Sequence, residues 1–398
     1  MNPFGTLVRR AEREWTRTRN RLAVFPAIAA RLLTEFEYGL DQDALDRWLA
    51  RWLRDSRRLP EQVSLHNTFG QPPITLFNNG SLVVDLYFWV AADTTTHSHG
   101  FRGGFRVLHG NSLQETFRVQ ATRRIAPGVM QFDPGVPQMA ILEQGGVHAI
   151  LPGEQFVHRV IHLEKPTVTL CVKTINEPGI RQWEYHPDGL ALERVDLAPD
   201  LTKEIYYFEY LRKRKPTMAA RYLREVVGAQ SVLMRMILVE ALCGGDLALP
   251  EEGIDQCLAE VRRHHGKADW FKRHVDPDPL FLKELQFAGC DTALERLVAH
   301  FINRGYARAT VDPLLSRLAG RALHRRDLEQ VVLSLLDGEY VLGCSLSPGD
   351  RSAIKEVALE PKEKLPHHLE SFGQIRRIRK FLRMFDQRPQ SRRAAEQK

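Results

Sequence analysis

Three histidines in two short stretches are the residues of this chain best suited to metal chemistry. His97 and His99 lie one residue apart, and His158 follows a Pro152-Gly153 pair further along the chain. Side chains of a strand alternate between its two faces, so a His-x-His pair on a strand points both imidazoles into one cavity. Three neutral imidazoles with open coordination positions suit Fe, Zn, Cu or Ni. The sequence therefore predicts one metal site made of His97, His99 and His158.

The region that carries these histidines reads as a series of short strands. Its β-branched and aromatic runs are separated by Gly, Pro, Asn and Asp, and Asn78-Asn79-Gly80 is a strong signal for a tight turn. The predicted strands are Leu82–Val90, Phe105–Leu108, Gln114–Val119, Gly146–Leu151, Gln155–Ile161 and Thr167–Thr174. Many short strands at this spacing predict a central antiparallel β-barrel or a double-sheet jelly roll.

Both flanks of the strand region show helical periodicity. Near the N-terminus, apolar residues recur at spacings of three and four, and Asp41 or Asp43 is placed to cap a helix. The stripe includes Leu45, Trp48, Leu49, Trp52 and Leu53. A lone helix would leave this stripe exposed, so we expect the flanks to pack against the strands or against a second copy of the chain.

Helical patterns return after about residue 200 and continue almost to the C-terminus. The predicted helices are Leu201–Arg214, Met218–Leu242, Ile254–His265, Pro279–Phe287, Thr292–Arg304, Pro313–Leu323, Asp327–Leu336 and Phe372–Phe385. The predicted class is therefore α+β, with a central β-barrel between two helical parts. The predicted segments are 1–59 (helical), 60–197 (β-barrel with the metal site), 198–386 (helical) and 387–398 (a basic polar tail).

Composition indicates a soluble protein of more than one domain. The chain has 398 residues, of which 43% are hydrophobic and 26% charged, and it carries no apolar run of membrane-spanning length. Its first residues lack the apolar core of a signal peptide. The five cysteines are scattered without a CxxC pair, which is typical of reduced thiols. We therefore expect a cytoplasmic protein without a membrane partner.

Arginine accounts for most of the net charge of +7 and is concentrated towards the two ends of the chain. Such a charge permits acidic partners or nucleic acid. No nucleic-acid-binding motif accompanies the charge, so we interpret the arginine-rich helices as solvated faces and expect no nucleic-acid partner.

The two histidine stretches resemble the motifs of the cupin superfamily. The first cupin motif has His-x-His, usually a glutamate, and then a glycine, and it is matched by His97, His99 and Gly110. The second motif has a Pro-Gly turn followed by a histidine, and Pro152, Gly153 and His158 match it. The glutamate position falls on Gly103, so the fourth cupin ligand is missing. The resemblance implies a cupin β-barrel with a metal bound by three histidines.

Within the cupins the chain looks most like the cysteine (thiol) dioxygenases, which bind iron through three histidines without a glutamate ligand. The similarity extends to Gly110-Asn111 and Glu115-Thr116. It implies Fe(II), with other divalent metals as alternatives, O2 as co-substrate and a small-molecule substrate. Two features depart from that family. Cys171 and Lys173 stand where it has the histidine and tyrosine of its relay, and Ile74–Asn79 lacks its carboxylate-binding arginine. The resemblance therefore implies the fold and metal site more than cysteine as substrate.

Two functions remain open from the residues. The first is an iron-dependent oxygenase, dioxygenase-like, acting on a thiol or another small anionic metabolite, with Arg102, Arg106 and Arg159 as candidates to hold a substrate carboxylate. Each of these arginines can equally be an ordinary surface residue. The second is a non-catalytic sensor of a metal or ligand whose helical arms bind a partner, and a homodimer through the helical regions fits either function. The sequence does not single out catalytic residues. His109, His148 and His162 are candidates to support the metal-bound imidazoles.

Overall fold

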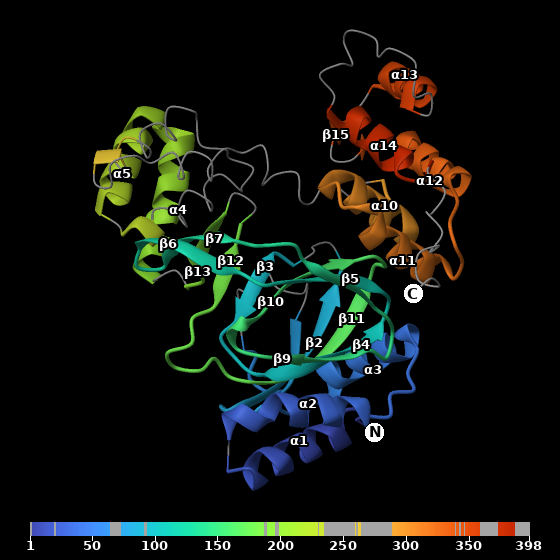
Figure 1. Ribbon diagram of the computed structural model, residues 1–398. Coiled ribbons are helices and arrows are strands. Elements are labelled where there is room, and N and C mark those ends of the chain that lie inside the picture. Colours follow the sequence, from blue (N-terminus) through green and yellow to red (C-terminus); the bar gives the residue numbers. More distant parts are fainter. Residues whose placement is uncertain are drawn as a thin grey trace, which may run out of the picture.

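The computed structural model describes residues 2–19, 21–63, 73–90, 94–186, 189–195, 199–229, 231–234, 259, 262–263, 289–338, 340–341, 344–345, 347–358 and 373–386. Strands occupy the middle of the molecule, and helices from the two ends of the chain lie on different sides of them (Figure 1). This mixture of helices and antiparallel sheets agrees with the α+β class predicted from the sequence.

A five-stranded antiparallel sheet forms one layer of the central region. Its strands, in spatial order, are β1 (Pro73–Asn78), β2 (Leu82–Trp89), β11 (Thr167–Thr174), β4 (Gly103–His109) and β9 (Val147–Ile150). The central strands β2 and β11 are almost wholly buried, because one face of the sheet is covered by helices and the other faces a second sheet. Alternation along β11 turns Val168, Leu170 and Val172 towards the helices and Thr169, Cys171 and Lys173 towards the second sheet.

The second layer is an eight-stranded antiparallel sheet that carries the predicted metal ligands. Its strands, in spatial order, are β6 (Gln120–Ala126), β7 (Val129–Asp133), β13 (Leu190–Glu193), β12 (Trp183–Tyr185), β3 (Thr96–His99), β10 (Gly153–His162), β5 (Ser112–Phe117) and β8 (Gln138–Leu142). Strand β3 with the His-x-His pair lies next to β10, which carries His158.

The two sheets face each other across a shared core and a cavity. A cluster of buried side chains joins Phe105 and Cys171 of the first sheet to Leu142 and Val160 of the second. Two antiparallel sheets in this relation are the architecture of double-sheet jelly rolls, a class that includes the cupins. No ladder among the described residues joins an edge strand of one sheet to an edge strand of the other, so closure into a barrel stays a prediction.

Three N-terminal helices cover the outer face of the five-stranded sheet (Figure 1). They are α1 (Gly5–Arg17), α2 (Phe25–Thr34) and α3 (Gln42–Asp55), with a short 3-10 turn at Leu22–Val24 before α2. Asp41 caps α3 by accepting a hydrogen bond from the Ala44 backbone at 2.7 Å, which confirms one of the two predicted caps. Leu45 and Leu49 are buried against the sheet, and Trp48 and Trp52 pack at the edge of the same cluster. The predicted packing of the N-terminal flank on the strands is confirmed.

Removal of residues 1–59 is expected to abolish soluble folding of the strand region. The deletion would expose apolar side chains that the helices keep fully buried, and exposed patches of this kind drive aggregation. These side chains are Leu82, Val84, Leu86, Val168, Leu170 and Val172. The soluble fraction and thermal melting of a chain that begins at residue 60 test this. A truncated protein as soluble and stable as the full chain would contradict it.

Helices after residue 198 form two groups that lie apart from each other in Figure 1. The first is the pair α4 (Pro199–Arg214) and α5 (Pro216–Ala229). The second contains α10 (Ala293–Arg304), α11 (Arg308–Ala319), α12 (Arg325–Asp337), α13 (Pro348–Ala358) and α14 (Gly373–Arg383), with the short strands β14 (Tyr340–Val341) and β15 (Cys344–Ser345). Helix α10 begins at a capping box in which Thr292 and Glu295 each bond the other's backbone.

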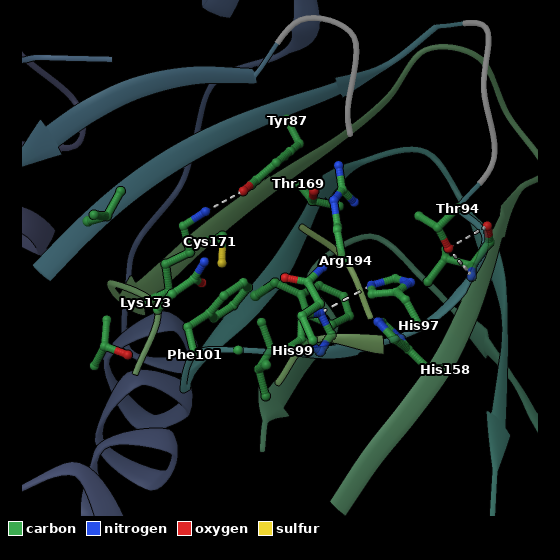
Figure 2. A pocket seen from close by; sticks show the side chains of 18 of the residues that line it. Tyr87, Thr94, His97, His99, Phe101, His158, Thr169, Cys171, Lys173 and Arg194 are labelled. Atoms are coloured by element: carbon green, nitrogen blue, oxygen red, sulfur yellow. Dashed lines mark hydrogen bonds between the residues drawn. The ribbon is translucent and has the colours of Figure 1, made fainter. Parts of the chain in front are cut away.

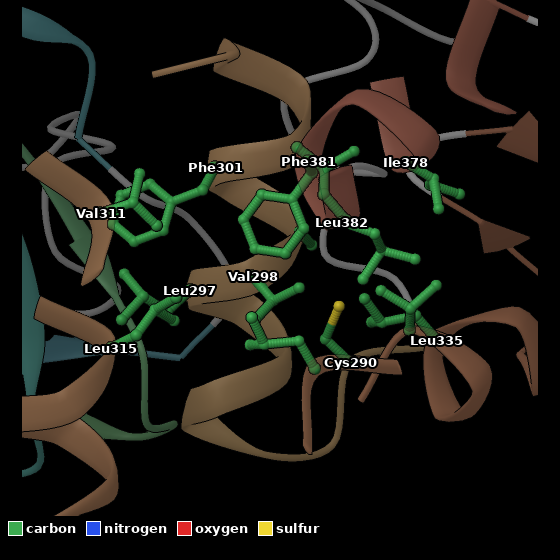
Figure 3. Close-up of a cluster of buried hydrophobic side chains, with 14 of the residues drawn as sticks. Cys290, Leu297, Val298, Phe301, Val311, Leu315, Leu335, Ile378, Phe381 and Leu382 are labelled. Carbon is green, nitrogen blue, oxygen red and sulfur yellow. The ribbon is translucent and has the colours of Figure 1, made fainter. Parts of the chain in front are cut away.

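The second group has an apolar core of its own that extends onto the eight-stranded sheet (Figure 3). Phe301 of α10 and Phe381 of α14 are fully buried in it, and Leu113 and Ile161 of β5 and β10 belong to the same cluster. The helices therefore pack on the outer face of the sheet that bears the histidines. The predicted packing of the C-terminal flank is confirmed for this group.

Several predicted C-terminal helices overlap observed ones, but α5 ends at Ala229, where the prediction ran to Leu242, and α11 begins at Arg308, where the prediction began at Pro313. Residues 235–242 of the predicted helix lie outside the described residues. The predicted helices 254–265 and 279–287 lie outside the described residues apart from positions 259, 262 and 263. Helix α13 was not among the predicted helices, because Ser347-Pro348-Gly349-Asp350 at its start is composed of residues typical of turns. Pro348 instead begins the helix, where its missing N–H costs nothing. The segment boundaries 59/60, 197/198 and 386/387 stay a prediction. Within the described residues, none of the helices has the length and apolar character needed to cross a membrane.

Candidate metal centre and its cavity

The three predicted ligands come together at the junction of β3 and β10. His97 and His99 share one face of β3, and His158 of β10 is the direct register partner of His97. Paired residues of antiparallel strands place their side chains next to each other. The ring centroids are 4.7 Å apart for His97 and His99, 4.8 Å for His97 and His158, and 5.0 Å for His99 and His158.

The donor atoms of this cluster fit a single ion. One ring nitrogen of each histidine lies within 4.8 Å of one in the other two, and the Nε2 atoms of His97 and His99 are 3.3 Å apart. Two imidazoles bound to one ion at about 2.1 Å, at tetrahedral or right angles, would hold their nitrogens roughly 3.0–3.4 Å apart. All three side chains are buried, so the donors are shielded from competing water.

Backbone and side-chain acceptors orient two of the imidazoles. The Nδ1 of His97 donates to the carbonyl oxygen of Thr95 at 2.7 Å, so its Nε2 carries the lone pair that could bind an ion. The Nδ1 of His158 lies 3.4 Å from Oε1 of Gln114, an arrangement of the same kind. The buried Nδ1 of His99 has no hydrogen-bond partner in the described part of the chain. Metal-bound histidines are usually oriented by a hydrogen bond from their second ring nitrogen, as is found for Nδ1 of His97 and of His158.

Burial keeps the three imidazoles neutral. It lowers the pKa of His97 to about 4 and takes the pKa values of His99 and His158 well below their ordinary range. Metal ions bind the neutral form of imidazole, so near neutral pH no proton has to leave before an ion binds. The three imidazoles are therefore already in the protonation state that binds a metal cation.

Gly103 occupies the usual glutamate position of the first cupin motif for a steric reason. A Cβ at this position would lie 2.2 Å from the carbonyl oxygen of Val172 and 2.8 Å from the Cα of Lys173, both on the adjacent strand β11. These neighbours are backbone atoms and cannot move aside without shifting the strand. No side chain fits here, so a fourth ligand from this position is excluded.

Gly103→Ala is accordingly expected to destabilise the protein by about 1–3 kcal/mol or more, the usual range for overpacked sites. Gly39→Ala is the matched control, because a Cβ there meets nothing within 4 Å. Thermal or urea unfolding of both variants measures the difference. Equal stability of Gly103→Ala and the parent protein would show that the strand has room for a side chain.

A cavity of ≈ 430 Å³ lies between the two sheets and opens onto the three histidines (Figure 2). Pockets of several hundred Å³ are typical of small-molecule sites. Trp89, Phe101 and Phe105 line it, and Lys173 and Arg194 contribute charged groups. The cavity is large enough to hold a small substrate beside a bound ion.

The three arginines expected to hold a substrate lie elsewhere, which revises that expectation. Arg102 donates to Glu177 at 2.8 Å, and Arg106 donates to the carbonyl oxygens of Leu33, at 2.9 Å, and Phe36 at the end of α2. Arg159 is paired with Glu115 on the face of the second sheet that meets the C-terminal helices. None of the three is among the residues that line the cavity. Consecutive residues of a strand face opposite ways, so Arg159 turns away from the site that His158 enters.

The remaining histidines of the region have separate partners. His162 lines the cavity, stacks on Trp89 at 4.4 Å and bonds Ser112 at 3.0 Å. His109 bonds the hydroxyl of Tyr38 at 2.8 Å, and His148 stacks on Phe105. Their contacts with Trp89, Ser112, Tyr38 and Phe105 give each of these histidines a partner outside the cluster of three.

A buried polar cluster on the cavity wall was missed by sequence reasoning. The Lys173 ammonium lies 2.7 Å from a carboxylate oxygen of Asp85 and 2.6 Å from the hydroxyl of Tyr87. Asp85 also accepts from Thr75 at 2.7 Å. The available signal was a carboxylate in the middle of the apolar strand Leu82–Val90, since buried charges are nearly always paired.

A second buried carboxylate joins the metal-bearing sheet to the C-terminal helices. Glu115 of β5 is fully buried and accepts from Arg159, from His300 at 2.8 Å and from Tyr306 at 2.7 Å. Burial disfavours the charged carboxylate, but His300, Arg159 and Tyr306 together hold the pKa of Glu115 below its usual range. Burial lowers the pKa of His300 to about 4, so this histidine serves as a neutral donor near neutral pH.

Comparison with known proteins yields structural likeness only. No family model and no curated sequence matches the chain. Structure comparison finds DMSP lyase DddQ from Ruegeria pomeroyi DSS-3, with 14% identity, 47% of this chain and 98% of that chain covered, and a TM-score of 0.25. It also finds a double-stranded β-helix protein from Klebsiella pneumoniae subsp. pneumoniae MGH 78578 (14% identity, 34% and 90% covered, TM-score 0.16). A third match is the Escherichia coli ribosomal oxygenase YcfD (12% identity, 48% and 40% covered, TM-score 0.16). Such low scores and identities leave fold and activity to be judged from the chain's own residues.

Proposed function

We propose that this chain is a cupin-type oxygenase whose His97, His99 and His158 bind one Fe(II) ion, and that it oxidises a small anionic metabolite, such as a thiol, with O2. The observation that supports this most directly is the convergence of three buried, neutral imidazoles on one point at the wall of a cavity. Imidazole suits iron among the first-row metals, and no cysteine belongs to the donor cluster.

The geometry indicates what a bound metal and the protein would each contribute to the reaction. Bound iron would supply the redox chemistry that O2 requires. The protein holds His97 in its ligating tautomer and supplies a cavity lined by aromatic side chains and by the charged groups of Lys173 and Arg194. Three neutral ligands leave the full charge of a divalent ion uncompensated, which favours an anionic substrate or co-ligand.

Metal analysis and oxygen uptake test the proposal. Full-length protein purified without chelators is expected to hold about one ion per chain, with iron restoring activity best after metal removal. Oxygen consumption with a panel of small thiols and other acids then identifies the substrate class. Absence of stoichiometric metal binding would reject the site, and stoichiometric iron without oxygen uptake on any substrate would reject the oxygenase.

A second candidate function is a non-catalytic sensor of a metal or ligand. The observation in its favour is the contact of Arg159, next to His158, with Glu115, which in turn accepts from His300 and Tyr306 near the end of α10. Arg159 directly follows His158 on β10, so a shift of this strand at the metal centre would reach the helices through these hydrogen bonds. Ligand-dependent changes in proteolysis of residues 289–386, without oxygen consumption, would favour the sensor over the oxygenase.

A further inference from the structure

A buried lysine stands on the cavity wall without a role in the proposed metal site. Lys173 projects from β11 into the space between the sheets and is only 8% exposed. Burial opposes its charge, but Tyr87 and Asp85 raise the pKa of Lys173 above its ordinary value. The side chain is therefore positively charged near neutral pH.

The hydrogen-bonding capacity of this ammonium is not exhausted. It has three N–H donors, and hydrogen bonds to Asp85 and Tyr87 use two of them. The ammonium lies 5.0 Å from the ring centroid of Phe101, and the Phe101 ring lies 4.9 Å from that of His99. Lys173 is thus one aromatic ring away from the metal ligands, on the wall of the same cavity (Figure 2).

We propose that Lys173, held in place by Asp85 and Tyr87, binds the carboxylate of a small substrate whose other end reaches the three-histidine centre. The assignment rests on the proposed function for the identity of the reacting end, but not for the binding of the acid. It takes the place of Arg102, Arg106 and Arg159, which were the candidates for this task from the sequence.

The surroundings of Lys173 favour a carboxylate over a phosphate. A phosphate requires several donors, whereas the ammonium offers one more N–H and part of its charge is already balanced by Asp85. Part of the lining is apolar, with Phe101, Phe105 and Val107, and Arg194 adds a second positive group beside His97 (Figure 2). The chemical class that fits is a small carboxylic acid with an apolar middle part.

Calorimetric titration of the metal-free, full-length protein tests this. The probes are the straight-chain acids from propanoate to hexanoate and, as uncharged analogues, the corresponding amides. At least one acid is expected to bind about 10-fold or more tightly than its amide, a difference of about 1.4 kcal/mol. Lys173→Met is expected to remove this preference, and Asp85→Asn to increase it several-fold, because Lys173 then loses its counter-charge. An ion pair with a purely structural role would leave the preference unchanged in both variants.

Two further variants serve as a substitute for Lys173→Met and as a control for the loss of a positive charge. Lys173→Met leaves Asp85 buried without its cation, so the double variant Asp85→Asn/Lys173→Met serves if the single variant does not fold. Arg123→Gln, at an exposed site on β6, removes the same charge without touching the cavity and is expected to keep the preference. The proposal is overturned if no acid binds more tightly than its amide, or if the double variant keeps the preference. Neither result depends on the metal or on turnover, so the proposed oxygenase is tested separately.

Discussion

His158→Ala is expected to reduce bound metal from about one ion per chain to nearly none. Two remaining imidazoles cannot define the geometry of the site, so the loss in affinity should exceed the roughly 10–100-fold that changes in the outer shell cost. The fold should persist, because the core between the sheets rests on aliphatic and aromatic side chains. Elemental analysis after dialysis and circular dichroism measure the two quantities. Full metal occupancy in this variant would refute the assignment.

His162→Ala is the matched control for that experiment. His162 is also a buried histidine of β10 and lines the same cavity, but it lies outside the donor cluster and stacks on Trp89. Metal content is expected to stay close to that of the parent protein. Loss of metal in both variants would indicate that any cavity-forming change in β10 disrupts the site, and the role assigned to His158 would lose its support.

Glu115→Ala is expected to destabilise the protein by about 3–5 kcal/mol, the usual cost of removing one partner of a buried ion pair. The substitution leaves Arg159 without its carboxylate and deprives His300 and Tyr306 of their acceptor. All these groups lie where α10 meets the eight-stranded sheet, so the contact between helices and sheet should open first. Urea unfolding gives the free energy, and limited proteolysis reports exposure of residues 289–386.

Glu143→Ala is the control for Glu115→Ala, because it also removes a carboxylate that binds a C-terminal helix but lies outside the buried network. Glu143, just after β8, also bridges the sheet to a C-terminal helix by accepting from Arg317 of α11 at 2.7 Å. Both side chains are about half exposed, and exposed ion pairs contribute little to stability. An unchanged unfolding midpoint is expected for this variant. If Glu115→Ala also left the unfolding midpoint unchanged, the buried network would not hold the helices on the sheet.

Local spacing was sufficient to predict the strand-rich and helical regions and the three metal ligands, but short strands such as β12 and the helix α13 were not predicted. The β-branched run Thr167–Thr174 and the tight-turn signal at Asn78-Asn79-Gly80 predicted strands that the structure confirms, because strand propensity and turn chemistry act over a few residues. The period of two in His97 and His99 also predicted their common face. His158 was joined to this pair because it follows Pro152-Gly153 in the strand-rich region, and the register of β3 against β10 shows why the three meet.

The direction of charged side chains was decided by tertiary structure. Arg102, Arg106 and Arg159 looked suitable for a substrate because they flank the histidines in sequence, yet each lies against a partner from a distant segment. Lys173 had no signal of function in its own strand, and its position follows from the pairing of β11 with β2, which carries Asp85 and Tyr87. A strand's sequence shows which residues share a face. Only the packing of the sheets and helices decides whether that face meets a cavity or a helix, because burial and partners come from segments far apart in the chain.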